Sequence, residues 1–147
     1  MLRGIPSLIS PDLLAALMAM GHGDQLAIAD GNFPSSSLAR RLLRADGHGI
    51  PALLDAILRF FPLDSFVPQP AALMAVVPGD TARTDIWDEY GRIVKRWEPR
   101  FNGFEMVERF AFYERARAAY AVLATGEQAL YANIILTKGV VKPAEAG

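Results

Sequence analysis

The sequence predicts an α/β fold in which helices cover a β-sheet. Segments with apolar residues at helical spacing alternate with short apolar runs along the whole chain, and no internal repeat interrupts them. The chain has 147 residues, of which 52% are hydrophobic. This length can bury a substantial core but is short for two domains, so residues 1–147 are expected to form one domain.

The first third of the chain predicts one helix and two strands. Ser10-Pro11-Asp12 is a typical helix start, because it combines a hydroxyl cap, a proline at the first helical position and an acid in the first turn. Gly21 is placed to end that helix. Residues 26–29 are too few for a helix and predict a buried strand. A loop is expected at 33–37, and a second short strand near 41–44.

The middle of the chain predicts two further helices around another strand. Pro51 begins a segment with one apolar face. The continuous apolar run Ala71–Val77 is typical of a strand buried on both faces. A helix beginning near Thr84 or Asp85 is expected to bury Ile86, Tyr90, Ile93, Val94 and Trp97.

The last third predicts a strand, a helix and a strand. A strand is expected within Phe104–Glu108, and a helix from about Phe112 to Thr125 with Gly126 as its stop. Asn133–Leu136 is apolar enough for a central strand. The tryptophans and phenylalanines are expected to belong to the core.

Composition disfavours several classes of function. The net charge of −1 comes from mixed acids and bases, so no basic face for nucleic acid is expected. Without cysteine there can be no disulfide, thiolate zinc site or cysteine nucleophile. Two histidines without clustered acids do not predict a metal site. Neither a signal peptide nor a membrane span is recognisable, and the lack of cysteine favours the cytoplasm.

His22 is the first candidate for chemistry, because it lies between two glycines just before the strand at 26–29. Histidine exchanges protons near neutral pH, which suits a general acid or base. The alternative is a histidine whose only role is its position at a helix C-terminus, where the helix dipole favours the imidazolium form. Asp30 stands at the far end of the strand and has the alternative of a simple turn or cap. His48, between glycines in another turn, is interpreted as a solvated residue.

Three polar residues near the C-terminus complete the candidate set. Arg109 precedes a helix, while Tyr131 and Asn133 open the last strand. With Asp30 they offer both hydrogen-bond donors and acceptors, which sugar hydroxyls require. Each alone is equally compatible with a surface ion pair or a strand-end hydrogen bond. The glycine-rich turns lack the spacing of a phosphate loop or a dinucleotide fingerprint, so no cofactor is expected.

Several runs taken together closely resemble the L-fucose mutarotase family, which is the sister of the D-ribose pyranases. They are Leu8–Pro11, Met20–Asp24, Arg44–Gly47, Leu63–Ser65, Arg109–Ala116 and Tyr131–Leu136. The resemblance implies a mixed α/β fold and a ring-shaped homo-oligomer, commonly a decamer, with a monosaccharide bound near subunit boundaries.

Carried over residue by residue, the resemblance implies that His22 is the acid/base histidine and that Asp30 binds the sugar. It places the basic sugar contact at Arg109 and the tyrosine–asparagine pair at Tyr131 and Asn133, with Tyr131 a candidate for the second proton carrier. Arg109 and the run Phe110–Arg115 favour the fucose branch over the pyranase branch, and an apolar residue of this run is expected to contact the sugar methyl group. Residues 81–103 match less well.

The implied reaction exchanges the α and β anomers of L-fucose. The ring opens when the anomeric hydroxyl loses a proton and the ring oxygen gains one, so no redox step is needed. The alternatives are pyranose–furanose interconversion of the D-ribose pyranase type and a non-catalytic sugar-binding regulatory subunit.

The spacing of His22 and Asp30 predicts a site shared between subunits. An extended strand over residues 25–29 rises ~3.3 Å per residue, which places its ends roughly 15 Å apart. Two residues at opposite ends can hardly contact one small sugar, unless the loop at His22 folds back along the strand. A neighbouring subunit that supplies one side would resolve this conflict.

Overall fold

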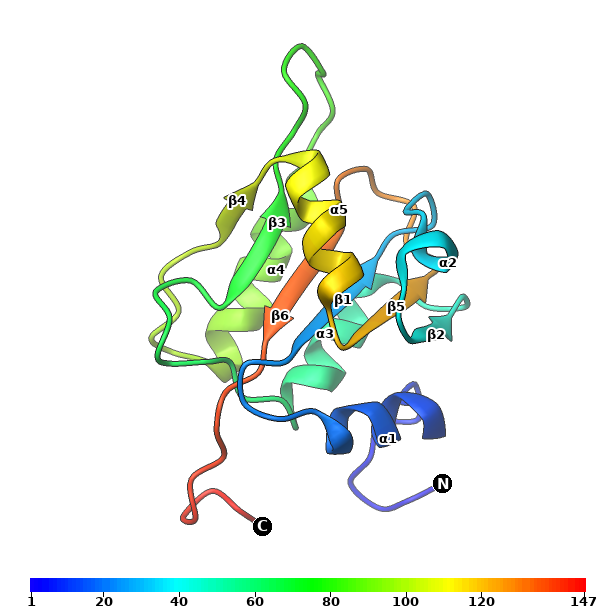
Figure 1. Cartoon of the computed structure of the whole chain (residues 1–147). Coiled ribbons are helices and arrows are strands. Elements are labelled where there is room, and N and C mark those ends of the chain that lie inside the picture. Colours follow the sequence, from blue (N-terminus) through cyan, green and yellow to red (C-terminus); the bar gives the residue numbers. More distant parts are fainter.

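The computed structural model describes residues 1–147 and contains one mixed six-stranded sheet between layers of helices (Figure 1). The strand order is β2-β5-β1-β6-β3-β4. The strands are β1 (Gln25–Ala29), β2 (Leu42–Ala45), β3 (Ala71–Met74), β4 (Glu105–Val107), β5 (Ala121–Thr125) and β6 (Ile134–Thr137). β6 runs antiparallel to its neighbours β1 and β3, and the other pairs are parallel. The predicted α/β domain is therefore confirmed.

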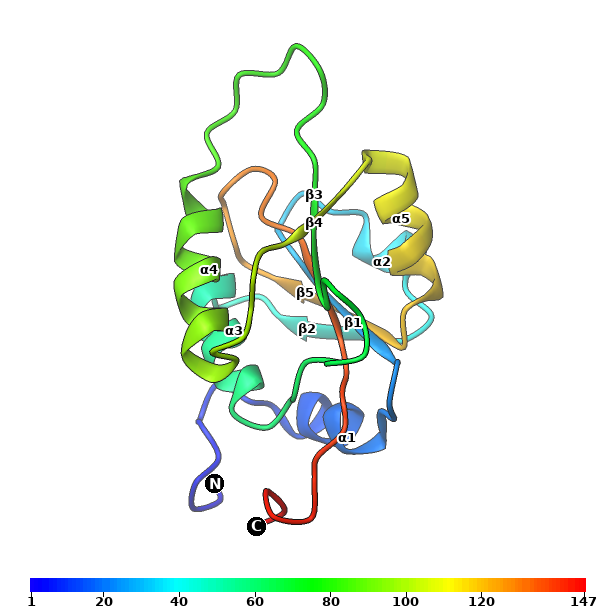
Figure 2. The ribbon, with the colours of Figure 1, turned by 90° about the vertical axis from the view of Figure 1, so that its left-hand side faces the viewer.

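Helices cover both faces of the sheet, as the edge-on view in Figure 2 shows. They are α1 (Pro11–Ala19), α2 (Ser35–Leu38), α3 (Ile50–Leu58), α4 (Asp85–Trp97) and α5 (Arg109–Ala118). α1, α3 and α4 contribute to a cluster of 24 buried residues, and α2 and α5 to a cluster of 11 on the other face. Along β1, Leu26 and Ile28 join the larger cluster while Ala27 and Ala29 join the smaller. This alternation fixes the face that each strand residue presents.

The helix starts predicted at Ser10–Pro11, at Pro51 and at Thr84 or Asp85 are confirmed to within one residue. The Ser10 hydroxyl accepts a hydrogen bond from the Leu13 N–H at 3.1 Å, and Pro11 is the first residue of α1. α3 begins one residue before Pro51, and α4 begins at Asp85. None of the five helices has the length and apolar character needed to cross a bilayer.

The predicted helix from Phe112 to Thr125 is wrong. α5 begins at Arg109 and ends at Ala118, and after a short turn the chain enters β5. Every residue of β5 is buried, and β5 pairs in parallel with both β1 and β2. A short run of alanine, valine and leucine has no periodicity that separates a central strand from a buried helix. Its pairing with β1 and β2 is what makes this segment a strand.

Four smaller expectations also differ from the structure. The segment expected as a loop at 33–37 contains the short helix α2, and β3 ends at Met74 rather than Val77. Trp97 is 38% exposed instead of buried, and its indole N–H donates to Asp55 at 2.9 Å. Not all phenylalanines belong to the core, because Phe66 and Phe110 are exposed.

Candidate functional site

Polar side chains gather at one edge of the sheet, where β1, β3, β4 and β5 end. Asp30 follows β1 and Arg109 follows β4 closely. Because β6 runs in the opposite direction, the residues that precede it, Tyr131 and Asn133, lie at this same edge. Carboxyl ends of parallel strands are frequent ligand sites. We call Asp30, Arg109, Tyr131 and Asn133 the Asp30 cluster; all four line one hollow of about 240 Å³.

Asp30 is buried beside this hollow, with 5% of its surface exposed. Its carboxylate accepts a hydrogen bond from the Asn32 N–H at 3.0 Å, and its own N–H donates to Oδ1 of Asn133 at 2.8 Å. Burial raises the pKa of Asp30 above its usual value, and hydrogen bonds to the carboxylate offset only part of this effect. The structure thus makes Asp30 a turn-forming residue and a wall of the hollow.

Arg109 is held at the first turn of α5. The preceding residue, Glu108, caps the helix by accepting the N–H groups of Phe110 and Ala111 at 2.9 and 3.1 Å, and these bonds lower the pKa of Glu108. The Arg109 guanidinium lies over the Phe110 ring, 4.5 Å from its centroid. Its Nε is buried and has no hydrogen-bond partner in the protein. A buried unpaired donor beside a polar hollow fits a site that a ligand hydroxyl or water completes.

Tyr131 is the only non-glycine residue with a positive φ, at 54°. Its carbonyl accepts from the Trp87 indole at 2.8 Å, and the next carbonyl, of Ala132, accepts from the Tyr90 hydroxyl at 2.8 Å. Left-handed backbone is unfavourable for a large side chain and persists where surrounding contacts hold it. Two aromatic residues of α4 therefore support the segment that presents Tyr131 and Asn133.

Several residues around the hollow were missed by the sequence reasoning. They are Asn32, Phe33, Met74, Val77, Asp80, Tyr113 and Leu130. Tyr113 follows Arg109 by four positions, so helical spacing alone places the two on one face. In the run expected to contact a sugar methyl group, Phe112 is core and Phe110 supports Arg109, which leaves Tyr113 at the hollow.

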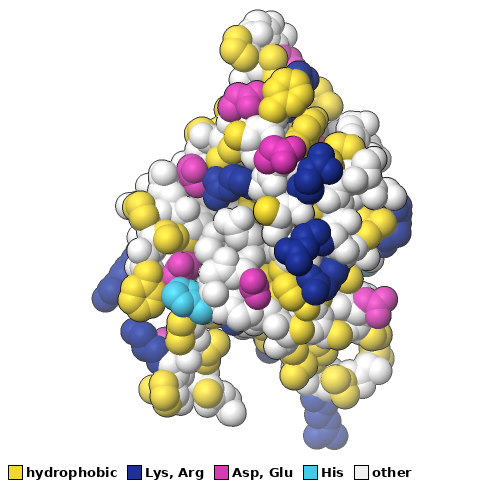
Figure 3. All heavy atoms as spheres, viewed as in Figure 1, with side chains coloured by type: hydrophobic (Ala, Val, Ile, Leu, Met, Phe, Trp, Pro, Cys, Tyr) yellow, Lys and Arg dark blue, Asp and Glu magenta, His cyan; other side chains and the backbone are white.

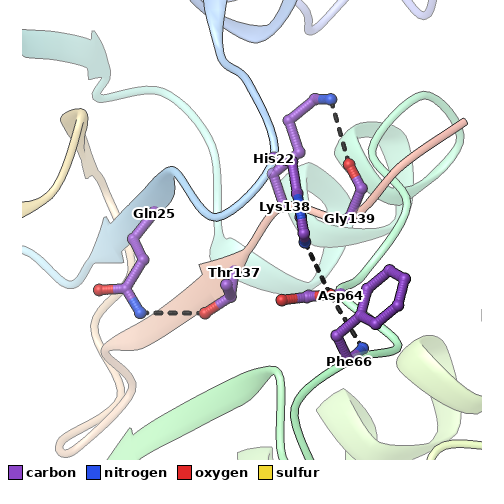
Figure 4. A network of polar contacts seen from close by, with 7 residues as sticks. All are labelled: His22, Gln25, Asp64, Phe66, Thr137, Lys138 and Gly139. Carbon is purple, nitrogen blue, oxygen red and sulfur yellow. Dashed lines mark hydrogen bonds and ion pairs between the residues drawn. The ribbon is translucent and has the colours of Figure 1, made fainter.

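His22 lies at the opposite edge of the sheet, in the turn between α1 and β1. Its Nε2 is 3.1 Å from Oδ1 of Asp64, and the Phe66 N–H donates to the same oxygen at 3.0 Å (Figure 4). The Phe66 ring, 78% exposed, is tilted against the imidazole with centroids 5.5 Å apart. We call His22, Asp64 and Phe66 the His22 cluster. Asp64 and Phe66 were not among the predicted site residues.

Backbone contacts with the end of β6 hold this second cluster together. The Gly23 N–H donates to the Lys138 carbonyl at 2.8 Å, and Gly23 has a φ of 84° that favours glycine. A Cβ on Gly139 would lie 2.5 Å from the Leu63 carbonyl oxygen. Glycine at 139 therefore lets the segment before Asp64 approach the sheet, and the glycine at 23 lets the His22 turn do the same.

The two clusters flank β1 at its opposite ends, as its extended length requires. The Asp30 cluster offers fixed hydrogen-bonding groups, whereas the His22 cluster offers an imidazole oriented by a buried carboxylate. His48 is an exposed turn residue, as expected. No group of three or more potential metal ligands occurs. On the face drawn in Figure 3, Lys and Arg side chains are interspersed with acidic and hydrophobic ones.

Known proteins resemble this chain over nearly its whole length. The RbsD / FucU transport protein family matches residues 3–141. The human protein named fucose mutarotase is 51% identical, with 95% of this chain and 94% of that protein covered. The L-fucose mutarotase of Actinobacillus pleuropneumoniae serotype 5b is 47% identical, covering 95% of this chain and 97% of that protein. A crystal structure of the Streptococcus pneumoniae fucose mutarotase in complex with L-fucose superposes with a TM-score of 0.89 at 48% identity, covering 96% of this chain and all of that one.

Proposed function

The chain belongs to the RbsD / FucU family, and on that premise we propose that it is a fucose mutarotase that interconverts the α and β anomers of L-fucose. The observation that carries the proposal is its identity of about half, over nearly the full length, with proteins named for this activity. The hollow lined by the Asp30 cluster supports it, because it combines donors and acceptors suited to sugar hydroxyls.

In this proposal His22 carries a proton, while Asp30, Arg109, Tyr131 and Asn133 hold the hydroxyl groups. Ring opening removes the proton of the anomeric hydroxyl and adds one to the ring oxygen; rotation about C1–C2 and closure reverse both transfers. Nδ1 of His22 is free to exchange protons because Nε2 faces Asp64. A positioned acid–base group typically contributes about 10²–10⁴-fold to such a step.

The same proposal includes a ring-shaped homo-oligomer, with a decamer as the expected size. In this ring, the His22 cluster of one subunit faces the Asp30 cluster of its neighbour. Two features support it. The clusters lie at opposite ends of β1, so one chain cannot bring both to a single small sugar. The hollow of about 240 Å³ is also smaller than the ~300–1,000 Å³ typical of enclosed ligand sites, as expected of a site with one wall absent.

Exchange spectroscopy by NMR tests the activity directly. Adding the protein to L-fucose at anomeric equilibrium is expected to increase the rate of magnetisation transfer between the α and β signals in proportion to protein concentration. Binding of L-fucose without faster exchange would instead assign the chain to the non-catalytic sugar-binding class. Faster pyranose–furanose exchange of D-ribose than anomer exchange of L-fucose would favour the pyranase reaction.

A further inference from the structure

The hydroxyl of Tyr131 makes two hydrogen bonds to one loop of its own chain. It donates to Oδ2 of Asp80 at 2.6 Å and accepts the Val77 N–H at 3.3 Å. Both partners belong to the segment between β3 and α4, which projects from the body of the protein at the top of Figure 1. The second oxygen of Asp80 remains within this segment, where it accepts the Ala82 N–H at 2.9 Å.

The phenol of Tyr131 can make only a few hydrogen bonds. A tyrosine hydroxyl has one proton to donate and two lone pairs to accept with. The proton of Tyr131 is directed to Asp80, and one lone pair receives Val77. One acceptor position remains, and both Tyr131 and Asp80 line the hollow. A sugar hydroxyl that meets Tyr131 in this state must be the donor.

We propose that Asp80 is a positioning residue of the sugar site, which holds the Tyr131 proton away from the sugar so that Tyr131 accepts one sugar hydroxyl. This inference rests on the proposed function, because it assigns the role of one residue in the same site. It gives Tyr131 a place in substrate binding and leaves the proton for the ring oxygen to another group. Asp80 itself acts through Tyr131.

The competing explanation is a purely structural one, in which the bond between Asp80 and Tyr131 only ties down the projecting segment. A structural tie predicts no change in how Tyr131 interacts with sugar. It also gives no reason for a selective effect on KM. The two explanations therefore separate in binding measurements with sugars that lack one hydroxyl donor, whereas the ionisation of Tyr131 tests the hydrogen bond that both explanations require.

The test compares three variants: Asp80→Ala, Asp80→Asn and Asp85→Asn. Asp80→Ala removes the acceptor, whereas Asp80→Asn keeps an amide oxygen that the phenol can reach. Asp85→Asn removes a carboxylate close by in the chain, whose ion pair is with Arg83 and which does not line the hollow. For L-fucose, Asp80→Ala is expected to raise KM and the calorimetric dissociation constant about 3- to 10-fold, with kcat within about twofold. Asp80→Asn is expected to recover most of the affinity, and Asp85→Asn to match the native protein.

Fluorinated sugars identify the direction of the hydrogen bond. In 2-, 3- and 4-deoxyfluoro-L-fucose, fluorine replaces a hydroxyl that can donate with a group that cannot. One of the three should bind the native protein more weakly than L-fucose, by about 3- to 10-fold, and the same loss should be absent in Tyr131→Phe. A loss that persists unchanged in Tyr131→Phe for all three sugars would overturn the acceptor role.

The ionisation of Tyr131 gives a readout that needs no catalysis. The hydrogen bond to Asp80 raises the pKa of Tyr131, so Asp80→Ala should lower that pKa in a phenolate absorbance titration. Subtracting the titration of matching Tyr131→Phe proteins isolates Tyr131 from the other three tyrosines. An unchanged Tyr131 pKa, or an unchanged affinity for L-fucose in Asp80→Ala, would overturn the proposal, as would a lower kcat at constant KM. Failure of the proposed function would appear separately, as native protein without anomer exchange.

Discussion

Nε2 of His22 lies 3.1 Å from Oδ1 of Asp64, whose side chain is 5% exposed while that of His22 is 47% exposed. The inner partner of this pair is thus a buried acceptor, and the outer partner is accessible to a ligand. A carboxylate that accepts from Nε2 selects the tautomer in which Nδ1 is the free, unprotonated nitrogen. The pair therefore fits a histidine held ready to take a proton from a sugar hydroxyl.

Replacing His22 with alanine is expected to lower kcat for anomer exchange by about 10²–10⁴-fold, because a positioned acid–base group is lost. Affinity for L-fucose should stay within a few-fold of the native value, since the Asp30 cluster is untouched. His48→Ala is the matched control, because His48 is exposed in a turn, and it should exchange at the native rate. Equal loss of binding and rate would place His22 among the hydroxyl-holding groups.

Replacing Asp64 with asparagine tests the orientation of the imidazole. The amide keeps an oxygen for the Phe66 N–H but removes the negative charge, and its NH₂ group can donate to Nε2 and favour the opposite tautomer. We expect kcat to fall at least about 10-fold with little change in melting temperature. Native rates in Asp64→Asn would mean that Asp64 has no part in proton transfer.

The Asp30 cluster shows what the sequence could and could not predict. The Ser10 cap, the helical spacing of apolar residues from about Asp85 and the short apolar run at 26–29 were sufficient to locate α1, α4 and β1. The contact between Asp30 and Asn133, which are 103 residues apart, could not be predicted from such local patterns, because it depends on β6 lying antiparallel beside β1. Family resemblance supplied the grouping instead.

Asp64 and Asp80 were missed for a related reason. Each contacts a partner distant in sequence, and nothing in its local pattern distinguishes it from the other exposed or turn-forming acids of the chain. β5 was misassigned because its burial arises from pairing with β1 and β2 rather than from local periodicity.

Asp30→Asn is expected to stabilise the fold while impairing the enzyme. Burial raises the folded-state pKa of Asp30, so protonation is favoured on folding, and its contribution to stability is lost as pH rises through that raised value. The ionised carboxylate is therefore a cost at neutral pH that asparagine removes. The melting temperature should exceed that of the native protein at pH 7, and the difference should shrink as the pH approaches and passes below 3.8.

The accompanying loss in kcat/KM should be about 10- to 150-fold, the range for a hydrogen bond to a charged group. A lower melting temperature for Asp30→Asn at pH 7 would contradict the stability argument. Native activity would instead contradict the role of Asp30 in sugar binding.

Discrimination for the sugar methyl group should be measurable but modest. Phe33, Met74, Val77 and Leu130 give the hollow an apolar part that can contact it. D-arabinose has the ring stereochemistry of L-fucose without that group, so the two sugars differ by one methyl, worth ~1 kcal/mol or about fivefold in kcat/KM. Equal kcat/KM for both sugars in NMR exchange would show that the methyl group does not contact the protein.

The composite site is tested by mixing two strongly impaired variants. His22→Ala retains an intact Asp30 cluster, and Asp30→Asn retains an intact His22 cluster. If each site takes one cluster from each of two neighbouring chains, random exchange of subunits at equal amounts restores both halves in about one quarter of the sites. Activity should then rise to about one quarter of the native level only after mixing under conditions that allow exchange. Distinguishable labels on the two variants show independently that their subunits have exchanged. Labelled mixed oligomers without recovered activity would mean that both residues serve one site from the same chain, which would require the His22 turn to fold back along β1.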